Sequence, residues 1–179
     1  MTEAEGNTAV RRIVTRVDEQ DKAVVLFDGP REGVSRPGRK VVSNLIWATD
    51  RSPAGFSNGV DFADTHKGIT PAKQGSIFRI LDYPPASPGT GTPPVATAPS
   101  VHEESEIRGL PPRHLGMHRT RTVDYVIVLS GEITMLLDDS EVHLKQGDVL
   151  VQQATNHAWV NRGTQTCRIA VILVDSEAP

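Results

Sequence analysis

Short runs of aliphatic and β-branched residues, separated by glycine, proline and charged turns, recur along this 179-residue chain. Such side chains pack well on a pleated sheet and lose more freedom in a helix. Within residues 75–83, Ile77, Arg79 and Leu81 alternate with Phe78 and Ile80, which is typical of a β-strand. No helix long enough to cover a sheet is indicated. The pattern therefore predicts an all-β fold whose sheet closes on itself or pairs with a second one.

The spacing of turn residues, about every 8–12 positions in the C-terminal half, is that expected of short antiparallel strands. The first two predicted strands are separated by a charged turn and read as a hairpin. In chain order, the expected strands are residues 12–17, 23–27, 40–47, 75–83, 114–120, 124–129, 132–137, 141–144, 149–153, 157–161 and 166–174.

Composition and charge exclude several classes of protein. Lys and Arg number 19 against 22 Asp and Glu, and a net charge of −3 argues against nucleic-acid binding, which uses a basic surface. No apolar run approaches the roughly 18 residues of a membrane helix, and residues 1–6 lack the basic start of a signal peptide. We expect a soluble, cytoplasmic protein. The single cysteine, Cys167, excludes an internal disulfide.

Two segments carry a family resemblance. Residues 116–131 read GMHRTRTVDYVIVLSG, and residues 147–161 read GDVLVQQATNHAWVN. They resemble the two motifs of the cupin superfamily, G-x5-HxH-x3,4-E-x6-G and G-x5-PxG-x2-H-x3-N. The resemblance implies a cupin-type antiparallel β-barrel of the jelly-roll kind with extra N-terminal strands.

This resemblance suggests four segments. Residues 1–10 are expected to be disordered. Residues 11–83 would supply N-terminal strands that pack on the barrel, and residues 113–179 would form the core barrel. Between them, residues 84–112 hold eight of the thirteen prolines, which predicts a surface loop that could lie beside the site.

In cupins, two histidines and a glutamate of the first motif and a histidine of the second bind a divalent metal. By position, His118 and His157 match two of these histidines, while Thr120 and Asp124 replace the second histidine and the glutamate. The resemblance thus implies a metal site of His118, Asp124 and His157 that takes iron or zinc before manganese. Two imidazoles and one carboxylate also suit non-haem Fe(II) with open positions.

Each of these residues also has an ordinary structural interpretation. A lone histidine on an apolar strand is more often a hydrogen-bonded interior residue than a metal ligand. Asp124 could instead cap the entry to its strand or pair with Arg121. Because His118 and Thr120 lie on one face of a strand, convergence on one site depends on His157 facing the same interior.

Three further residues are candidates for substrate binding: Thr120, Tyr125 and Arg79. The orientation of Tyr125 depends on strand register, since a slip of one residue reverses its face. Arg79 alternates with apolar residues and could enter the cavity to bind a carboxylate, or lie along the surface. We expect structural roles for Trp47 and Trp159, a barrel-mouth position for His114, and no chemistry at His66, His102 and His143.

The leading hypothesis is a small-molecule enzyme with its site inside the barrel, in which His157 and His118 are catalytic. Known cupin activities include dioxygenases, decarboxylases, dehydratases and cyclases, so the resemblance does not choose a reaction. One alternative is a non-catalytic ligand-binding or sensor cupin without metal, and another is a purely structural barrel. Unpaired edges of the N-terminal strands predict a homodimer.

Overall fold

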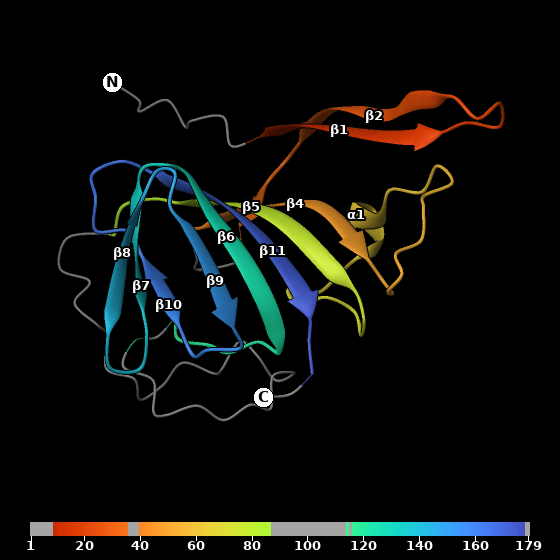
Figure 1. Cartoon of the computed structure of the whole chain (residues 1–179). Coiled ribbons are helices and arrows are strands. Elements are labelled where there is room, and N and C mark those ends of the chain that lie inside the picture. The colour runs from red at the N-terminus through yellow and green to blue at the C-terminus, as the bar shows by residue number, and fades with distance from the viewer. Residues whose placement is uncertain (1–8, 36–39, 87–113, 115, 178–179) are drawn as a thin grey trace, which may run out of the picture.

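Two antiparallel sheets face each other and enclose the interior of the protein (Figure 1). A computed structural model of the chain describes residues 9–35, 40–86, 114 and 116–177. The all-β prediction is confirmed, because a single four-residue helix, α1 (Phe62–Thr65), accompanies the strands of this part of the chain. No helix among these residues is long and apolar enough to cross a membrane.

The larger sheet has six strands and is built from both halves of the chain. Its strands, in spatial order, are β3 (Val34–Ser35), β4 (Val42–Thr49), β5 (Ser76–Tyr83), β11 (Cys167–Asp175), β6 (Thr122–Ser130) and β9 (Val149–Gln153). β5 pairs with both β4 and β11. The barrel therefore extends into the N-terminal half, where sequence reasoning expected strands that only pack on it.

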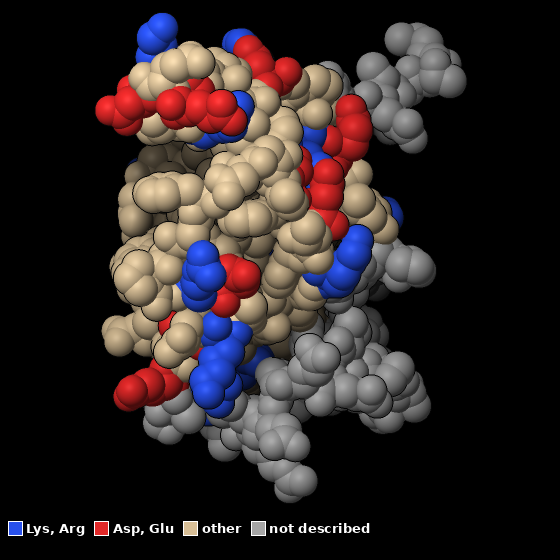
Figure 2. Space-filling model, turned by 90° about the vertical axis from the view of Figure 1, so that its right-hand side faces the viewer, with Lys and Arg blue, Asp and Glu red and all other residues tan. Residues whose placement is uncertain are grey.

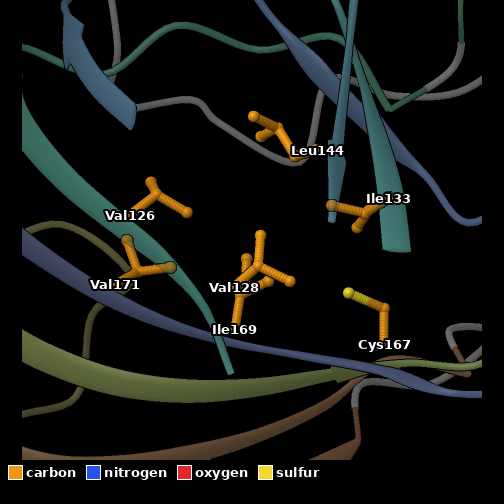
Figure 3. Close-up of a cluster of buried hydrophobic side chains, with 7 residues drawn as sticks. All are labelled: Val126, Val128, Ile133, Leu144, Cys167, Ile169 and Val171. Carbon is orange, nitrogen blue, oxygen red and sulfur yellow. The ribbon is translucent and has the colours of Figure 1, made fainter. Parts of the chain in front are cut away.

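The smaller sheet has three strands and covers the inner face of the larger one. Its order is β10 (Ala158–Val160), β7 (Glu132–Leu136) and β8 (Glu141–Lys145). Alternate residues of both sheets point into the space between them. The buried cluster they form, drawn in Figure 3, consists of Val126, Val128, Ile133, Leu144, Cys167, Ile169 and Val171.

The turn between β6 and β7 requires a glycine. Gly131 has a φ of +74°, and a Cβ there would lie 3.0 Å from the Cα of Cys167 and from the carbonyl oxygen of Thr166. A side chain would be strained by the backbone and by this contact. The glycine that ends the first motif thus lets the chain cross closely over β11 on its way from one sheet to the other.

One of the strands expected from the sequence is almost absent from the structure. The expected strand at residues 114–120 is reduced to one isolated bridge between His118 and His157. Most of the proline-rich segment 84–112 and most of residues 1–10 lie outside the described residues, so the expectations for them stay predictions. The expected cytoplasmic location is likewise a prediction.

The predicted N-terminal hairpin is confirmed, with β1 (Val10–Val17) paired to β2 (Ala23–Arg31), and it forms a two-stranded sheet of its own. Arg12 attaches it to the body by donating to the carbonyl oxygen of Ile46 and to both carboxylate oxygens of Asp61. Asp61 is also the N-cap of α1, since its side chain accepts from the Ala63 N–H. Figure 2 looks at this side of the molecule and shows acidic and basic side chains close together.

We predict that Asp61→Asn weakens the hairpin attachment. Asparagine keeps a capping oxygen but loses the charge, so the free energy of unfolding should fall by about 2 kcal/mol at pH 7. The hydrogen bond from Arg12 lowers the pKa of Asp61. A lowered folded-state pKa stabilises the protein above the unfolded value near ~3.9, and this contribution is lost as the pH falls through the folded value.

The difference between the two proteins should therefore shrink in acid, which urea unfolding at several pH values will measure. Asp28→Asn is the matched control, because Asp28 pairs with Arg11 on the exposed side of the same hairpin. That exposed pair should contribute no measurable stability. Equal effects of the two substitutions would contradict a special role for Asp61.

Candidate functional site

Two histidines from separate motifs are held side by side by their own backbones. The N–H of His118 donates to the carbonyl oxygen of His157 at 2.9 Å, and the N–H of His157 donates back to His118 at 2.9 Å. The two ring centroids lie 4.3 Å apart. Reciprocal backbone bonds therefore hold together two of the three residues, His118, Asp124 and His157, that make up the predicted metal set.

The backbone also sets the orientation of each ring. Nδ1 of His118 lies 2.9 Å from the carbonyl oxygen of Gly116, and Nδ1 of His157 lies 3.0 Å from that of Thr155. A carbonyl oxygen only accepts, so Nδ1 carries the proton in the neutral form of each ring and the lone pair is on Nε2. This tautomer suits a proton acceptor or a metal ligand at Nε2.

Asp124 lies on the inner face of β6 and is 4% exposed. Its Oδ2 accepts a hydrogen bond of 2.8 Å from Nε2 of Gln152, the residue opposite it on β9. Gln152 therefore occupies the place that sequence reasoning gave to Arg121. Burial raises the pKa of Asp124 to about 6. Its Oδ1 is buried and has no hydrogen-bond partner among the residues that the structure describes, so the carboxyl group can accept from, or when protonated donate to, a ligand.

These side chains share one pocket between the sheets, with a volume of about 520 Å³. His118, Thr120, Asp124 and His157 all line it. That volume falls within the roughly 300–1,000 Å³ of pockets that hold a small molecule. The structure thus brings together the four motif positions named from the sequence.

The described residues do not complete a three-ligand metal site. Among them, no group of three His, Cys, Asp or Glu side chains is arranged to hold a metal ion. The two imidazoles could serve as ligands, and Oδ2 of Asp124 accepts a hydrogen bond from Gln152. The hydroxyl of Thr120 is 2.8 Å from that of Thr122. The metal set of His118, Asp124 and His157 remains a prediction.

The substrate-binding prediction for Tyr125 is wrong. Tyr125 follows Asp124 directly on β6, and neighbouring residues of a strand point to opposite faces. Asp124 faces the pocket, so Tyr125 lies on the outer face, where it is 46% exposed. The sequence could not fix this register because apolar residues occupy both faces of β6.

Arg79 does face the pocket, as one of its two sequence interpretations required. Three further residues line it that sequence reasoning left without a functional role: His66, His114 and Trp159. His66 follows the short helix α1, which no periodicity indicated, so its approach to the barrel could not be inferred. His143, by contrast, lies outside the pocket and faces Glu132 at 3.4 Å.

Comparisons with known proteins identify the family of this chain. The family model of the cupin domain matches residues 101–174. A cupin-domain-containing oxidoreductase of Neurospora crassa, srdD, is 30% identical over 96% of this chain and 78% of its own length. Another, fogC of Aspergillus ruber, is 28% identical over 95% of this chain and 74% of its own length.

Among solved structures, an uncharacterised protein of Klebsiella pneumoniae with a double-stranded β-helix domain aligns with a TM-score of 0.46. It is 13% identical and covers 82% of this chain and 86% of its own. The family assignment depends on the sequence relatives and on the two motifs that meet at His118 and His157. The chain belongs to the cupin family.

Proposed function

We propose that this cupin is an enzyme that converts a small molecule inside the barrel pocket, with His118 and His157 as its reacting side chains. The observation that carries the proposal is the histidine pair, whose backbone-bonded Nδ1 atoms assign the lone pairs to Nε2 within a pocket of about 520 Å³. The N. crassa and A. ruber relatives are oxidoreductases by name, which favours oxidation or reduction among the possible reactions.

In this proposal the pocket residues have different roles. One imidazole takes a proton from the substrate while its neighbour, 4.3 Å away between ring centroids, orients the reacting group. Asp124, with a pKa of about 6, exchanges a proton near neutral pH. Apolar side chains such as Val126 and Leu173 exclude water around the bound molecule.

We predict that the protein changes the mass of at least one small molecule in a fractionated cell extract, detected by mass spectrometry. His118→Ala and His157→Ala should each lower the rate by at least about a hundredfold, because general acid–base groups contribute on that order. His143→Ala is the matched control and should keep full activity. Tight binding of a compound without conversion in any fraction, under air and under nitrogen, would favour the non-catalytic ligand-binding alternative.

A divalent transition metal is a second, separable part of the proposal. If His118, Asp124 and His157 hold iron, zinc or manganese, the metal supplies Lewis-acid or oxygen chemistry to the pocket. Protein purified without chelator should then contain metal by elemental analysis, and His157→Ala should lower that content severalfold. Thr120→His should raise it by adding an imidazole, and His143→Ala should leave it unchanged. A wild-type protein that takes up none of the three metals would contradict this prediction.

We also propose a homodimer formed through the hairpin. Part of its outward face is apolar, with Ile13 53%, Val17 60% and Val25 60% exposed, next to the exposed Arg11–Asp28 pair. A two-stranded sheet is marginal by itself, so a second copy that covers this face would stabilise both hairpins. In a twofold dimer the same surface of each subunit makes the contact, so one apolar face on each chain is sufficient.

Light scattering at micromolar concentration should therefore give twice the chain mass. Replacing both Val17 and Val25 by Asp should shift the protein to a monomer, since the two charges would be buried at the contact. Gln20→Asp, in the exposed turn of the same hairpin, controls for added charge and should leave the dimer intact. A wild-type monomer would contradict the proposal.

A further inference from the structure

The pocket crosses the strands of the larger sheet. Val126 on β6 pairs with Val171 on β11 in the strand register. Val171 also pairs with Arg79 on β5, and Arg79 pairs with Leu45 on β4. These four residues, called the central row here, all line the pocket. Three strand spacings of about 4.8 Å separate Val126 from Leu45, so the row is about 14 Å long.

Apolar side chains lie on every side of the central row. Leu173 and Leu81 follow it on β11 and β5, one on each side of the row. Trp159 lines the pocket from the smaller sheet, and Ile69 lines it from the segment after α1. An apolar molecule that lies along this surface removes both its own area and that of the protein from water, which favours binding.

Arg79 does not interrupt this surface with its charge. Nη1 of Arg79 donates to the hydroxyl of Ser43 at 3.0 Å, and Nη2 donates to the carbonyl oxygen of Gly68. Gly68 is exposed, so the guanidinium lies at the rim of the pocket. The aliphatic part of an arginine side chain can cover apolar surface while its charged end is solvated, and the stem of Arg79 continues the central row in this way.

The two ends of the pocket differ in exposure. At the β6 end, Asp124 is 4% and His157 3% exposed. The opposite end is formed by β3, which lies beside β4 at the edge of the sheet, and by the segment after α1. There Glu32, Val34 and Lys67 are exposed, Val34 to 69%. A molecule that enters past these three residues reaches the histidines with its leading end.

The buried end favours a polar group without charge. Among the described residues that line the pocket, the Lys and Arg side chains are Arg31, Lys67 and Arg79, all from the N-terminal half. At the buried end the acidic residue is Asp124. Burial of an ionised carboxylate without a positive partner is costly, and a second carboxylate beside Asp124 would also be repelled. A hydroxyl or carbonyl group meets neither penalty.

We propose that the substrate is an elongated, uncharged amphiphile, whose hydroxyl or carbonyl head lies at His118 and His157 and whose apolar chain lies along the central row. An extended chain advances about 1.2 Å per bond, so about twelve bonds span the 14 Å of the row. This inference deepens the proposed function and rests on it only in treating the pocket as the substrate site.

Simple alcohols of different length test the proposal. Titration calorimetry on the purified full-length protein would compare 1-hexanol, 1-octanol and 1-decanol, with octanoate as the charged counterpart of 1-octanol. One alcohol should bind per chain, and each added methylene should tighten binding about fourfold because it lies on the central row. Octanoate should bind at least about tenfold more weakly than 1-octanol.

A substitution at the open end should act on long chains alone. Leu45→Phe shortens the central row, so it should weaken the binding of 1-decanol about tenfold and leave that of 1-hexanol unchanged, since the shorter alcohol does not reach β4. Ile69→Phe repeats the test from the segment after α1, should Leu45→Phe not fold. Val149→Phe is the matched control, because Val149 is 64% exposed on β9 and should affect no alcohol. Thermal melting shows which variants are folded.

Several results would overturn the proposal. They are an affinity that does not change with chain length, tighter binding of octanoate than of 1-octanol, binding of none of the alcohols, and equal losses for 1-hexanol and 1-decanol in the folded variants Leu45→Phe or Ile69→Phe.

The binding experiment fails independently of the activity screen. Binding that depends on chain length, without conversion of any small molecule, would leave the amphiphile site in place and remove the enzymatic function. Conversion that depends on the histidines, without any dependence of binding on chain length, would do the reverse.

Discussion

The reciprocal backbone bridge between His118 and His157 is the constraint on which the site depends. His118 lies just before β6 of the larger sheet, and His157 lies just before β10 of the smaller one. The bridge therefore ties the two sheets together at one end of the barrel. Because the two hydrogen bonds are between backbone groups, they place the imidazoles side by side whatever the side chains then bind.

Asn161 makes the corresponding connection at the other end of β10. Its Nδ2 donates to the carbonyl oxygens of Tyr83 and Gln165, and its Oδ1 accepts from the N–H of Gly163. The Asn161 side chain is 3% exposed, so it replaces water at backbone groups that would otherwise be buried without partners. The asparagine that ends the second motif is thus structural, and the histidine four residues before it faces the pocket.

Alternation and turn spacing predicted most strands, because period-two patterns follow directly from strand geometry, but they left open whether Arg79 enters the cavity or lies along the surface. Tyr125 was misplaced because β6 is apolar on both faces, which hides its register. The Asp124–Gln152 hydrogen bond and the approach of His66 depend on which strands and loops become neighbours. Which segments become neighbours depends on residues far apart in the chain. A single sequence indicates such contacts only through motifs such as the two that bring His118 and His157 together.

Two stretches of the chain contribute different parts of the pocket lining. The histidine pair and Asp124 come from residues 118–157, whereas Arg79, His66 and the segment after α1 come from the N-terminal half. Substitutions in β4, β5 or the loop before them can therefore alter which molecule is accepted without disturbing the bridged histidines. Under the proposed function, such a division would allow descendants of one gene to diverge in what they accept while the bridged histidines are inherited unchanged.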